Sequence, residues 1–428
     1  MSNFELSAHF FLQLAFILVT IRVVGLIARK LGQPQVVGEM IAGVLIGPSL
    51  FGLLLPELHS QIFPQASMSI LYAVSQIGLV LYMFLVGVEF SVDLVRTRLR
   101  SAVSISAAGI LTPFILGGLI AFFLVGSHKF FAPGVSRWEG MLFFGAAMSI
   151  TAFPMLARII YERGLTGTPL GTLALACGAI DDATAWCVLA IVLASFSGSS
   201  MIAVIAIGGG MLYAIGALFI GRPLLRPLGR MAERNEGVSG SMLSFILVLL
   251  MLSAWYTDII NIYAVFGAFL LGIIMPRGVV TRDLKRFLEP ITTNFLLPLF
   301  FIYSGLNTRI GLVDSLGLWV VTLLVVLAAC LGKGVACWLA ARLNGEDNQQ
   351  AMSIGALMNA RGLMELIILN IGLQQGIITP TLFAIMVIMA IVTTLMTSPI
   401  FEFIHRRSPG RPPVVVLEPS PSSLFLSE

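Results

Sequence analysis

The stretch LGTLALACGAIDDATAWCVLAIVLASF, residues 170–196, decides the fold of this chain. It is apolar and long enough to cross a bilayer as a helix, which takes about 20 such residues. Two adjacent carboxylates, Asp181 and Asp182, lie near its middle. One carboxylate at mid-bilayer costs about 2.5–3.5 kcal/mol, and the second adds to that cost. The pair indicates a binding function within the membrane, and the simpler alternative is a purely structural pair neutralised by hydrogen bonds.

The composition of the whole chain is that of an integral membrane protein. Of its 428 residues, 58% are hydrophobic and 11% are charged, whereas a soluble domain has about 25% charged residues. The four cysteines lie in apolar stretches, without the spacing of a disulfide framework or a zinc site. No nucleotide-binding motif is found, so the sequence predicts no cofactor and no use of ATP. The N-terminus lacks the basic region of a signal peptide.

Apolar runs between turn and charge signals predict an all-α polytopic membrane protein with about thirteen transmembrane helices. The second and ninth runs fit a full crossing least well. The runs are approximately 8–28, 36–55, 69–90, 101–125, 138–160, 168–197, 200–220, 238–256, 260–276, 290–308, 315–342, 350–373 and 377–404.

The distribution of lysine and arginine predicts the orientation. Nineteen of these residues lie in alternate connections on one side, and the opposite side has only Lys129, Arg137 and Arg309. Cytoplasmic loops carry the excess of positive charge, so the N-terminus is expected outside and the C-terminus in the cytoplasm, with the cell (inner) membrane as the location. The Pro- and Ser-rich segment 406–428 is expected to be a short disordered cytoplasmic tail.

Lys333 is the predicted partner of the carboxylate pair. Adjacent residues on a helix point about 100° apart, so Asp181 and Asp182 face different surroundings, which favours a division of labour. At 1.5 Å per residue, Asp181 lies about 16 Å and Lys333 about 12 Å from the cytoplasmic end of their runs. The matched depths predict an ion pair, and glycines on both sides of Lys333 allow close helix packing. The alternative is a lysine that extends to the cytoplasmic surface.

The fifth run is interrupted. Pro154 lies within the segment AMSITAFPMLAR, residues 147–158, with Ser149 and Thr151 just before it. Irregular backbone at membrane depth is tolerated where it lines a cavity or is buried in protein. Ser149 and Thr151 therefore offer hydroxyl oxygens to an ion. The simpler interpretation is a proline kink in a helix whose ends these hydroxyls cap.

The twelfth run is interrupted by Asn359, Arg361 and Glu365 at mid-span. Opposed half-helix ends place partial charges at a central site. The simpler interpretation is an i,i+4 pair of Arg361 and Glu365. Runs 2–6 and 9–13 then match with an offset of seven helices, which inverts the second copy relative to the membrane. Inverted repeats of this kind are typical of secondary transporters.

These motifs in combination resemble the monovalent cation:proton antiporter-2 superfamily. The resemblance covers nearly all of residues 10–405 and is nearest to plant-type cation/proton exchangers and their cyanobacterial and bacterial relatives. It is carried by the helix with Asp181 and Asp182 and by the segments TAFPMLARII (151–160), LPLFFIYSGLNT (297–308), MNARGLMELIILNIG (358–372) and QPQVVGEMIAGVLIGP (33–48).

The resemblance implies an NhaA-like antiporter fold with two crossing broken helices. It implies a transmembrane unit over 1–405, with dimerisation helices at roughly 8–90 and 238–308 and core transport helices at roughly 101–197 and 315–404. It also implies a homodimer in membrane lipid and an elevator-like, alternating-access motion of the core.

The same resemblance implies a secondary active antiporter and not an enzyme. Asp182 would be the carboxylate that binds both the cation and the proton, and Asp181 would pair with Lys333. Plant-type relatives often have Asn-Asp at this position, whereas the Asp-Asp form with a lysine is similar to electrogenic sodium/proton members. We therefore expect Na⁺/H⁺ exchange, with K⁺/H⁺ exchange as the alternative. The transported partners are Na⁺, K⁺ or Li⁺ together with H⁺, and no nucleic acid is expected.

Other classes of protein fit the residues less well. A passive cation channel would show pore-lining repetition or a carbonyl filter sequence, and neither is found. An intramembrane aspartyl protease needs two carboxylates that face one substrate bond, normally from separate helices. A receptor or scaffold leaves the buried carboxylates unexplained.

Overall fold

The computed structural model describes residues 2–90, 92–197, 200–260, 262–306, 312–361 and 363–406. Over these residues the chain is helical without a β-strand, and one isolated bridge joins Phe131 to Ile378. Nine helices in this part of the chain are long and apolar enough to cross a membrane. The predicted all-α polytopic fold is confirmed, while the number of thirteen crossings stays a prediction. Residues 407–428 of the predicted tail lie outside the described part.

Each predicted run is occupied by one helix or by several in succession. The helices of the first half are α1 (Asn3–Lys30), α2 (Gln35–Ile46), the short α3 (Phe51–Leu54) and α4 (Pro56–Ile62), α5 (Gln65–Glu89), α6 (Val92–Leu124), α7 (Arg137–Ser149), α8 (Phe153–Glu162), α9 (Pro169–Ser197) and α10 (Ser200–Gly216). Those of the second half are α11 (Arg222–Arg234), α12 (Gly240–Ile259), α13 (Ala264–Ile274), α14 (Val279–Ile291), α15 (Leu297–Leu306), α16 (Leu316–Ala329), α17 (Ala336–Leu343), α18 (Asn348–Met358), α19 (Leu363–Gln374) and α20 (Pro380–Arg406).

Within the described ranges, three π-helical turns join successive helices, namely η1 (Ala217–Gly221), η2 (Thr292–Leu296) and η4 (Cys330–Val335). The two runs that fitted a crossing least well hold the short helices α2 and α13, of 12 and 11 residues. A helix of about 20 residues is needed to span the bilayer core. Helix α13 is shorter than that, whereas α2 reaches this length together with α3, over Gln35–Leu54.

The fifth run is broken where it was predicted to be interrupted, but Pro154 does not kink a helix. Helix α7 ends at Ser149, and Pro154 lies in the first turn of α8. A proline there loses no helical hydrogen bond, because first-turn N–H groups have no partner within the helix. The proline therefore starts the second half-helix, and the interpretation as a proline kink is wrong.

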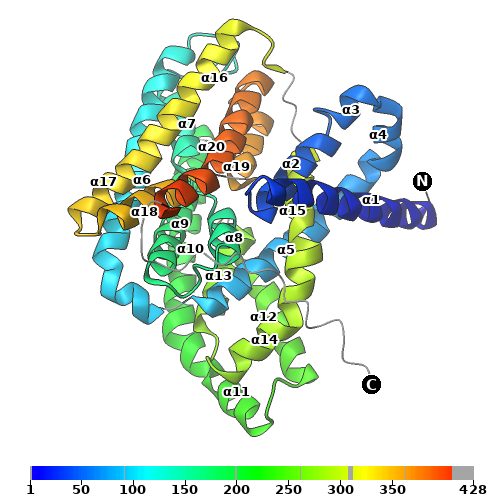
Figure 1. Cartoon of the computed structure of the whole chain (residues 1–428), viewed down its shortest axis with the longest axis vertical. Helices are drawn as coiled ribbons and strands as arrows, with labels where there is room; N and C mark the ends of the chain where they lie inside the picture. The colour runs from blue at the N-terminus through cyan, green and yellow to red at the C-terminus, as the bar shows by residue number, and fades with distance from the viewer. Residues whose placement is uncertain are drawn as a thin grey trace.

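The helices form two groups that pack mainly within themselves (Figure 1). In the first group, α6 packs against α7, α9 and α17, while α20 packs against α16 and α18. In the second, α5 packs against α13 and α15, while α2 packs against α1 and α15. The half-helices α8 and α19 connect the groups, because α8 contacts α2 and α5 and α19 contacts α15.

Glycines allow the close approach of α2 and α15 in the second group. A Cβ atom at Gly305 would lie 2.3 Å from the carbonyl carbon of Gly43. A Cβ atom at Gly43 would lie 3.0 Å from the carbonyl oxygen of Phe301. Small residues at such crossings let helix backbones meet directly, which is a main source of helix association in membranes.

Candidate ion-binding site

The two helix breaks cross each other inside the protein. After α7, the backbone N–H of Ala152 donates to the carbonyl of Ala360, which follows α18, with an N···O distance of 3.4 Å. Both residues are buried. Helix α9 packs against α7, α8 and α18, and these helices meet near the centre of the molecule (Figure 1). The ends of four half-helices, with their partial charges, are thus brought next to the helix that carries the two carboxylates.

Asp181 is fully buried and is held by Thr151 and Lys333. Its Oδ2 accepts a hydrogen bond from Thr151 Oγ1 at 2.5 Å and lies 3.0 Å from Lys333 Nζ. Lys333 is also fully buried, and its Nζ donates to the backbone carbonyl of Ser149 at the end of α7. The ion pair allowed by the matched depths is present. The alternative of a lysine that extends to the surface is wrong in this conformation.

Lys333 lies in the π-helical turn η4, which the sequence pattern did not predict. A Cβ atom at Gly332 would lie 3.1 Å from Pro113 Cα of α6, and one at Gly355 of α18 would lie 2.5 Å from the Gly334 carbonyl oxygen. The glycines on both sides of Lys333 therefore do allow close packing. A π-helical turn adds one residue to a helical turn and is frequent at functional sites. A single extra residue leaves too weak a trace in an apolar run to be detected.

Asp182 has different surroundings from its neighbour. Both residues are buried, but Asp182 does not share the contacts of Asp181 with Lys333 and Thr151. Adjacent positions on α9 thus differ as the helical geometry predicted. Asp181 is fixed by a cation and a hydroxyl of the protein, whereas the Asp182 carboxylate, also buried, is not part of that ion pair.

The hydroxyls of Ser149 and Thr151 do not act alike. Thr151 donates to Asp181. Ser149 Oγ donates instead to the carbonyl of Ala146 in the last turn of α7, at 2.8 Å. Ser149 therefore contributes its backbone carbonyl to Lys333, and its hydroxyl serves its own helix.

Arg361 and Glu365 form the predicted i,i+4 pair at the second break, with Arg361 Nη1 and Glu365 Oε1 3.6 Å apart and both residues buried. Asn359 closes α18, and its Nδ2 lies 3.5 Å from Cys330 Sγ in η4. Thr394 of α20 fixes the backbone here, because Arg361 N–H donates to its hydroxyl at 3.2 Å and the hydroxyl donates to the Arg361 carbonyl. Nothing in the sequence singled out Thr394 among the neighbouring threonines of its helix.

A large cavity of about 650 Å³ lies between the two groups of helices. Its walls include Tyr72 of α5 and Tyr303 of α15 on one side, and Leu373 and Phe383 of α19 and α20 on the other. His59 of α4 and Leu312, before α16, also line the cavity. Both lie in connections that are predicted to be on the outer face of the membrane.

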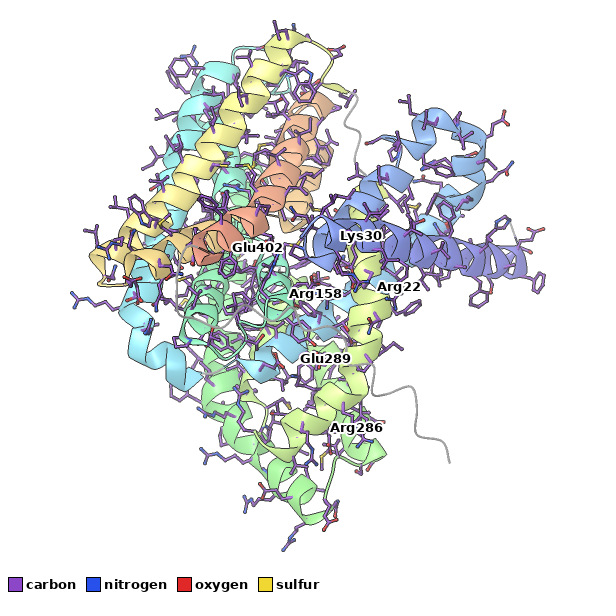
Figure 2. The ribbon with its side chains drawn as sticks, viewed as in Figure 1. Arg22, Lys30, Arg158, Arg286, Glu289 and Glu402 are labelled. Carbon is purple, nitrogen blue, oxygen red and sulfur yellow. The ribbon has the colours of Figure 1, made fainter. Side chains whose placement is uncertain are left out.

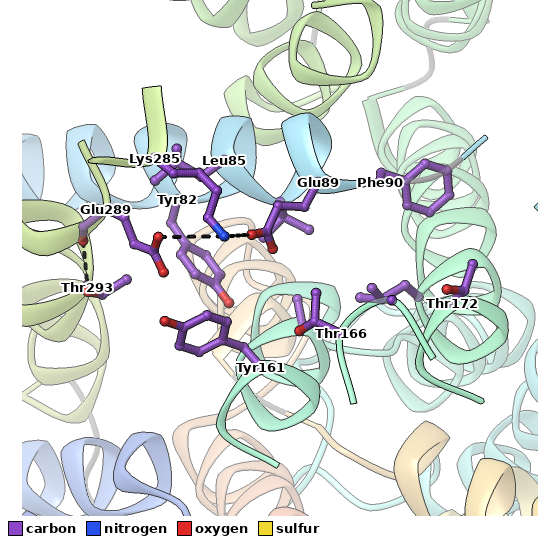
Figure 3. A pocket seen from close by; sticks show the side chains of 14 residues that line it. Tyr82, Leu85, Glu89, Phe90, Tyr161, Thr166, Thr172, Lys285, Glu289 and Thr293 are labelled. Carbon is purple, nitrogen blue, oxygen red and sulfur yellow. Dashed lines mark hydrogen bonds and ion pairs between the residues drawn. The ribbon is translucent and has the colours of Figure 1, made fainter. Parts of the chain in front are cut away.

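A small cavity of about 50 Å³ lies towards the predicted cytoplasmic end, between α5, α8, α9 and α14. Figure 3 shows Lys285 between Glu89 and Glu289, with Tyr82 and Tyr161 below them. Lys285 pairs with Glu89, and its Nζ lies 3.9 Å from Glu289 Oε2.

Contacts of the end of α8 with the start of α2 and with the turn before it close the protein beside the small cavity. Glu162 Oε2 accepts from the backbone N–H of Gln35 at 2.6 Å, and its Oε1 lies 2.7 Å from Arg158 Nε. Arg163 pairs with Glu402 and donates to the carbonyl of Gly32 at 2.9 Å. Arg158 and Glu402 lie near the middle of the view in Figure 2, where the two groups of helices meet. The contacts of Glu162 with Gln35 and of Arg163 with Gly32 join the groups at one end, opposite the large cavity.

Buried charges at two crossing helix breaks, within an all-helical multi-pass membrane protein, define a membrane transporter of the antiporter fold. Among solved structures, the sodium proton antiporter MjNhaP1 from Methanocaldococcus jannaschii has this fold, with a TM-score of 0.61 at 18% identity over 94% of this chain and 99% of that one. Residues 16–405 match the family described as "Sodium/hydrogen exchanger, transmembrane", and the chain belongs to that family.

Relatives with established names agree with this assignment. The Na(+)/H(+) antiporter NhaS4 of Synechocystis sp. is 42% identical over 90% of this chain and 94% of its own length. The Cation/H(+) antiporter 17 of Arabidopsis thaliana is 35% identical over 94% of this chain, which spans 48% of that longer protein. The K(+)/H(+) antiporter 1 of Saccharomyces cerevisiae is 30% identical over 92% of this chain and 46% of its own length. The antiporter family predicted from the motifs is confirmed, and it is a family of transporters.

Proposed function

We propose that this chain exchanges a monovalent cation, with Na⁺ as the expected substrate, for protons by alternating access. Asp182 is the shared binding site of the cation and the proton. One observation carries the proposal: Asp181 is already neutralised by Lys333 and held by Thr151, while the buried carboxylate of Asp182 beside it lies outside that ion pair at the crossing of the two helix breaks.

Coupling follows from the competition of two cations for one carboxylate. A carboxylate inside the membrane needs a positive charge beside it or a proton on it, because an uncompensated charge there is costly. Binding of Na⁺ to Asp182 then releases a proton to water on one side, and binding of a proton on the other side releases Na⁺. If the pair of Asp181 and Lys333 separates during the cycle, Lys333 is a second proton carrier.

The packing supports an elevator-like motion of the core helices, 101–197 and 315–404, against the dimerisation helices, 8–90 and 238–308. Each group packs mainly within itself, and the half-helices α8 and α19 join the groups. We propose a homodimer in the cell (inner) membrane. The N-terminus is placed outside and the C-terminus in the cytoplasm, because nineteen lysine and arginine residues lie in connections on one side and three on the other.

K⁺/H⁺ exchange is the second candidate. It is favoured by the similarity to the yeast K(+)/H(+) antiporter 1 and to the Na(+)/H(+)-K(+) antiporter GerN of Bacillus cereus, which is 26% identical over 92% of this chain. Selectivity among Na⁺, K⁺ and Li⁺ depends on small differences in site geometry and hydration.

The test is a cation-dependent pH change in proteoliposomes that contain a pH-sensitive dye, with Na⁺, K⁺ and Li⁺ added in turn. We expect the wild-type protein to exchange protons for one or more of these cations. Asp182→Asn should abolish the signal, and Asp314→Asn, which changes an exposed carboxylate, should leave it intact. Full exchange by Asp182→Asn would overturn the assignment of the site, and cation flux without proton movement would favour a passive channel.

A further inference from the structure

Glu39 is a buried carboxylate that the exchange at Asp182 does not use. It lies on α2 and is 0% exposed. Its Oε1 accepts a hydrogen bond from Gln35 Nε2 at 3.0 Å, whereas its Oε2 has no hydrogen-bond partner among the described residues. Glu39 is also absent from the ion pairs of the described ranges. A carboxylate in such a place needs a cation or a proton, because burying an uncompensated charge is costly.

Arg158 of α8 is the buried cation at this place, where the two groups of helices meet, and it is already paired (Figure 2). Its Nε lies 2.7 Å from Glu162 Oε1. Glu162 Oε2 accepts from the backbone N–H of Gln35 at 2.6 Å, so Gln35 links the carboxylate of Glu162 to that of Glu39. Two carboxylates thus share one buried guanidinium. With both of them ionised, this buried group would have one excess negative charge.

The other elements packed against α2 do not supply the missing charge. They are α1, α3 and α15, and the last two have no charged residue. Arg22 of α1 acts on Glu39 at longer range, but it is exposed and forms no ion pair with the described residues. Neither the large nor the small cavity is lined by Glu39. A proton removes the excess charge without the space that a metal cation needs.

The bond between Glu162 and Gln35 also joins the two groups of helices. Pro34, directly before α2, provides no side-chain cap for this helix. The first N–H groups of a helix have no partner within it, and a carboxylate there is favourable. Glu162 therefore caps α2 from the other group. Gln33 adds a further contact between the groups, since its Nε2 donates to the Leu395 carbonyl of α20 at 3.2 Å. Glu39 thus lies at the closed, predicted cytoplasmic end of the interface.

We propose that Glu39 is a second proton-binding carboxylate, which holds a proton while the cytoplasmic end is closed and releases it when that end opens. The proposal rests on the proposed function, because it needs the core helices to move against α2. Separation of α8 from α2 admits water, and Glu39 then ionises because its charge is solvated. A proton that binds the closed state more tightly also stabilises that state. Low cytoplasmic pH therefore favours closure, and high pH favours opening.

The experiment measures the exchange of radioactive Na⁺ for Na⁺ in everted membrane vesicles, with the same pH on both sides. This exchange needs no net proton transport, and saturating Na⁺ removes the competition with protons at Asp182. Radioactive Rb⁺ replaces Na⁺ if K⁺ is the substrate. We expect the wild-type kcat to rise with pH by up to about tenfold per pH unit, the limit for one proton. Glu39→Gln cannot ionise, so its kcat should stay near the low-pH value of the wild type.

Three further variants separate proton binding from packing. Glu39→Asp keeps an ionisable group and should keep the rise of kcat with pH. Glu162→Gln keeps an acceptor for the Gln35 N–H and frees Arg158 to neutralise Glu39. It should therefore also remove the rise, but with a kcat near the high-pH value of the wild type. Glu233→Gln is the control, since Glu233 is an exposed carboxylate of α11 on the same predicted face. It should follow the wild type.

Infrared spectroscopy of the purified protein tests the proton itself. The carbonyl band of protonated carboxyl groups at low pH should be weaker in Glu39→Gln than in the wild type and in Glu233→Gln.

A rise of kcat with pH in Glu39→Gln as steep as in the wild type, or an unchanged carboxyl band, overturns the role of Glu39. Failure of the proposed function gives a different result, because the wild-type protein would then show no exchange or Asp182→Asn would retain it. A flat pH profile in Glu39→Gln, in a chain whose exchange depends on Asp182, supports both.

Discussion

The two helix breaks neutralise charge in different ways. At the break between α7 and α8, the charges come from two other elements, α9 and η4, as the pair of Asp181 and Lys333 at 3.0 Å. At the break between α18 and α19, the pair of Arg361 and Glu365 comes from the broken chain itself and is 3.6 Å apart. The two inverted halves thus both have a broken helix beside a buried ion pair, but the charged residues lie on different elements in the two halves.

The hydrogen bonding of the two pairs also differs. Asp181 and Lys333 each bond to the connection between α7 and α8, through Thr151 and the Ser149 carbonyl. Among the described residues, the side-chain nitrogens of Arg361 and the carboxylate oxygens of Glu365 have no hydrogen-bond partner. The first pair therefore fixes the geometry beside Asp182, and the second neutralises half-helix ends. Four measurements test this comparison.

The largest effect is expected for Lys333→Ala. It leaves the fully buried Asp181 without its cation, and breaking a buried pair by removing one partner costs about 3–5 kcal/mol. The measurement is the free energy of unfolding in detergent. The double variant Lys333→Ala with Asp181→Ala should recover most of the loss. Equal instability of the single and double variants would show that lost packing, and not the unpaired charge, causes the effect.

Gly355→Ala should cost about 1–3 kcal/mol, because its Cβ atom would lie 2.5 Å from the Gly334 carbonyl oxygen, a backbone atom that cannot move alone. Gly178→Ala, beside the other break, should cost less. Its Cβ atom would meet the tips of Leu156 and Phe153 at 2.9 and 3.0 Å, and side chains can turn away. Unfolding of the two variants, with Gly208→Ala as a control in open space, measures the difference. The reverse order would show that α8 is held more rigidly than the turn η4.

Lys285→Gln measures how much an ion pair at the rim of the small cavity contributes to the free energy of unfolding. The side chains of Lys285 and Glu89 are 34% and 24% exposed, and a pair that water reaches contributes about 0.2–1 kcal/mol. Salt screens such a pair, so the stability difference from the wild type should shrink between low and high salt. A loss as large as that of Lys333→Ala would contradict the idea that burial separates the two lysines.

The smallest effect on stability is expected for the double variant Arg361→Met with Glu365→Leu. Replacing both members of a buried pair by apolar residues is often neutral or stabilising. Among the described residues, the charged groups of Arg361 and Glu365 make no hydrogen bonds, so the double variant breaks none there. Unfolding measures this directly. A loss of several kcal/mol would show that the second break depends on its pair as much as the first.

The sequence alone determined the class of fold and most of the candidate site. Hydropathy and the cost of a charge at membrane depth are properties of single stretches of sequence. The all-α fold, the two interrupted runs and the matching depths of Asp181 and Lys333 in the membrane could therefore be predicted from the sequence. The order of the charges along the chain also gave the i,i+4 pair at the second break.

Only the tertiary structure decided which groups meet between stretches distant in sequence. It placed Pro154 at the start of a half-helix, directed the Ser149 carbonyl and not its hydroxyl at Lys333, and brought Thr394 to the backbone of Arg361. Residue type limits what a side chain can bind, but the packing of the helices selects its partner. Contacts between helices depend on how distant backbones approach each other and on side-chain rotamers, and no single stretch of sequence specifies either.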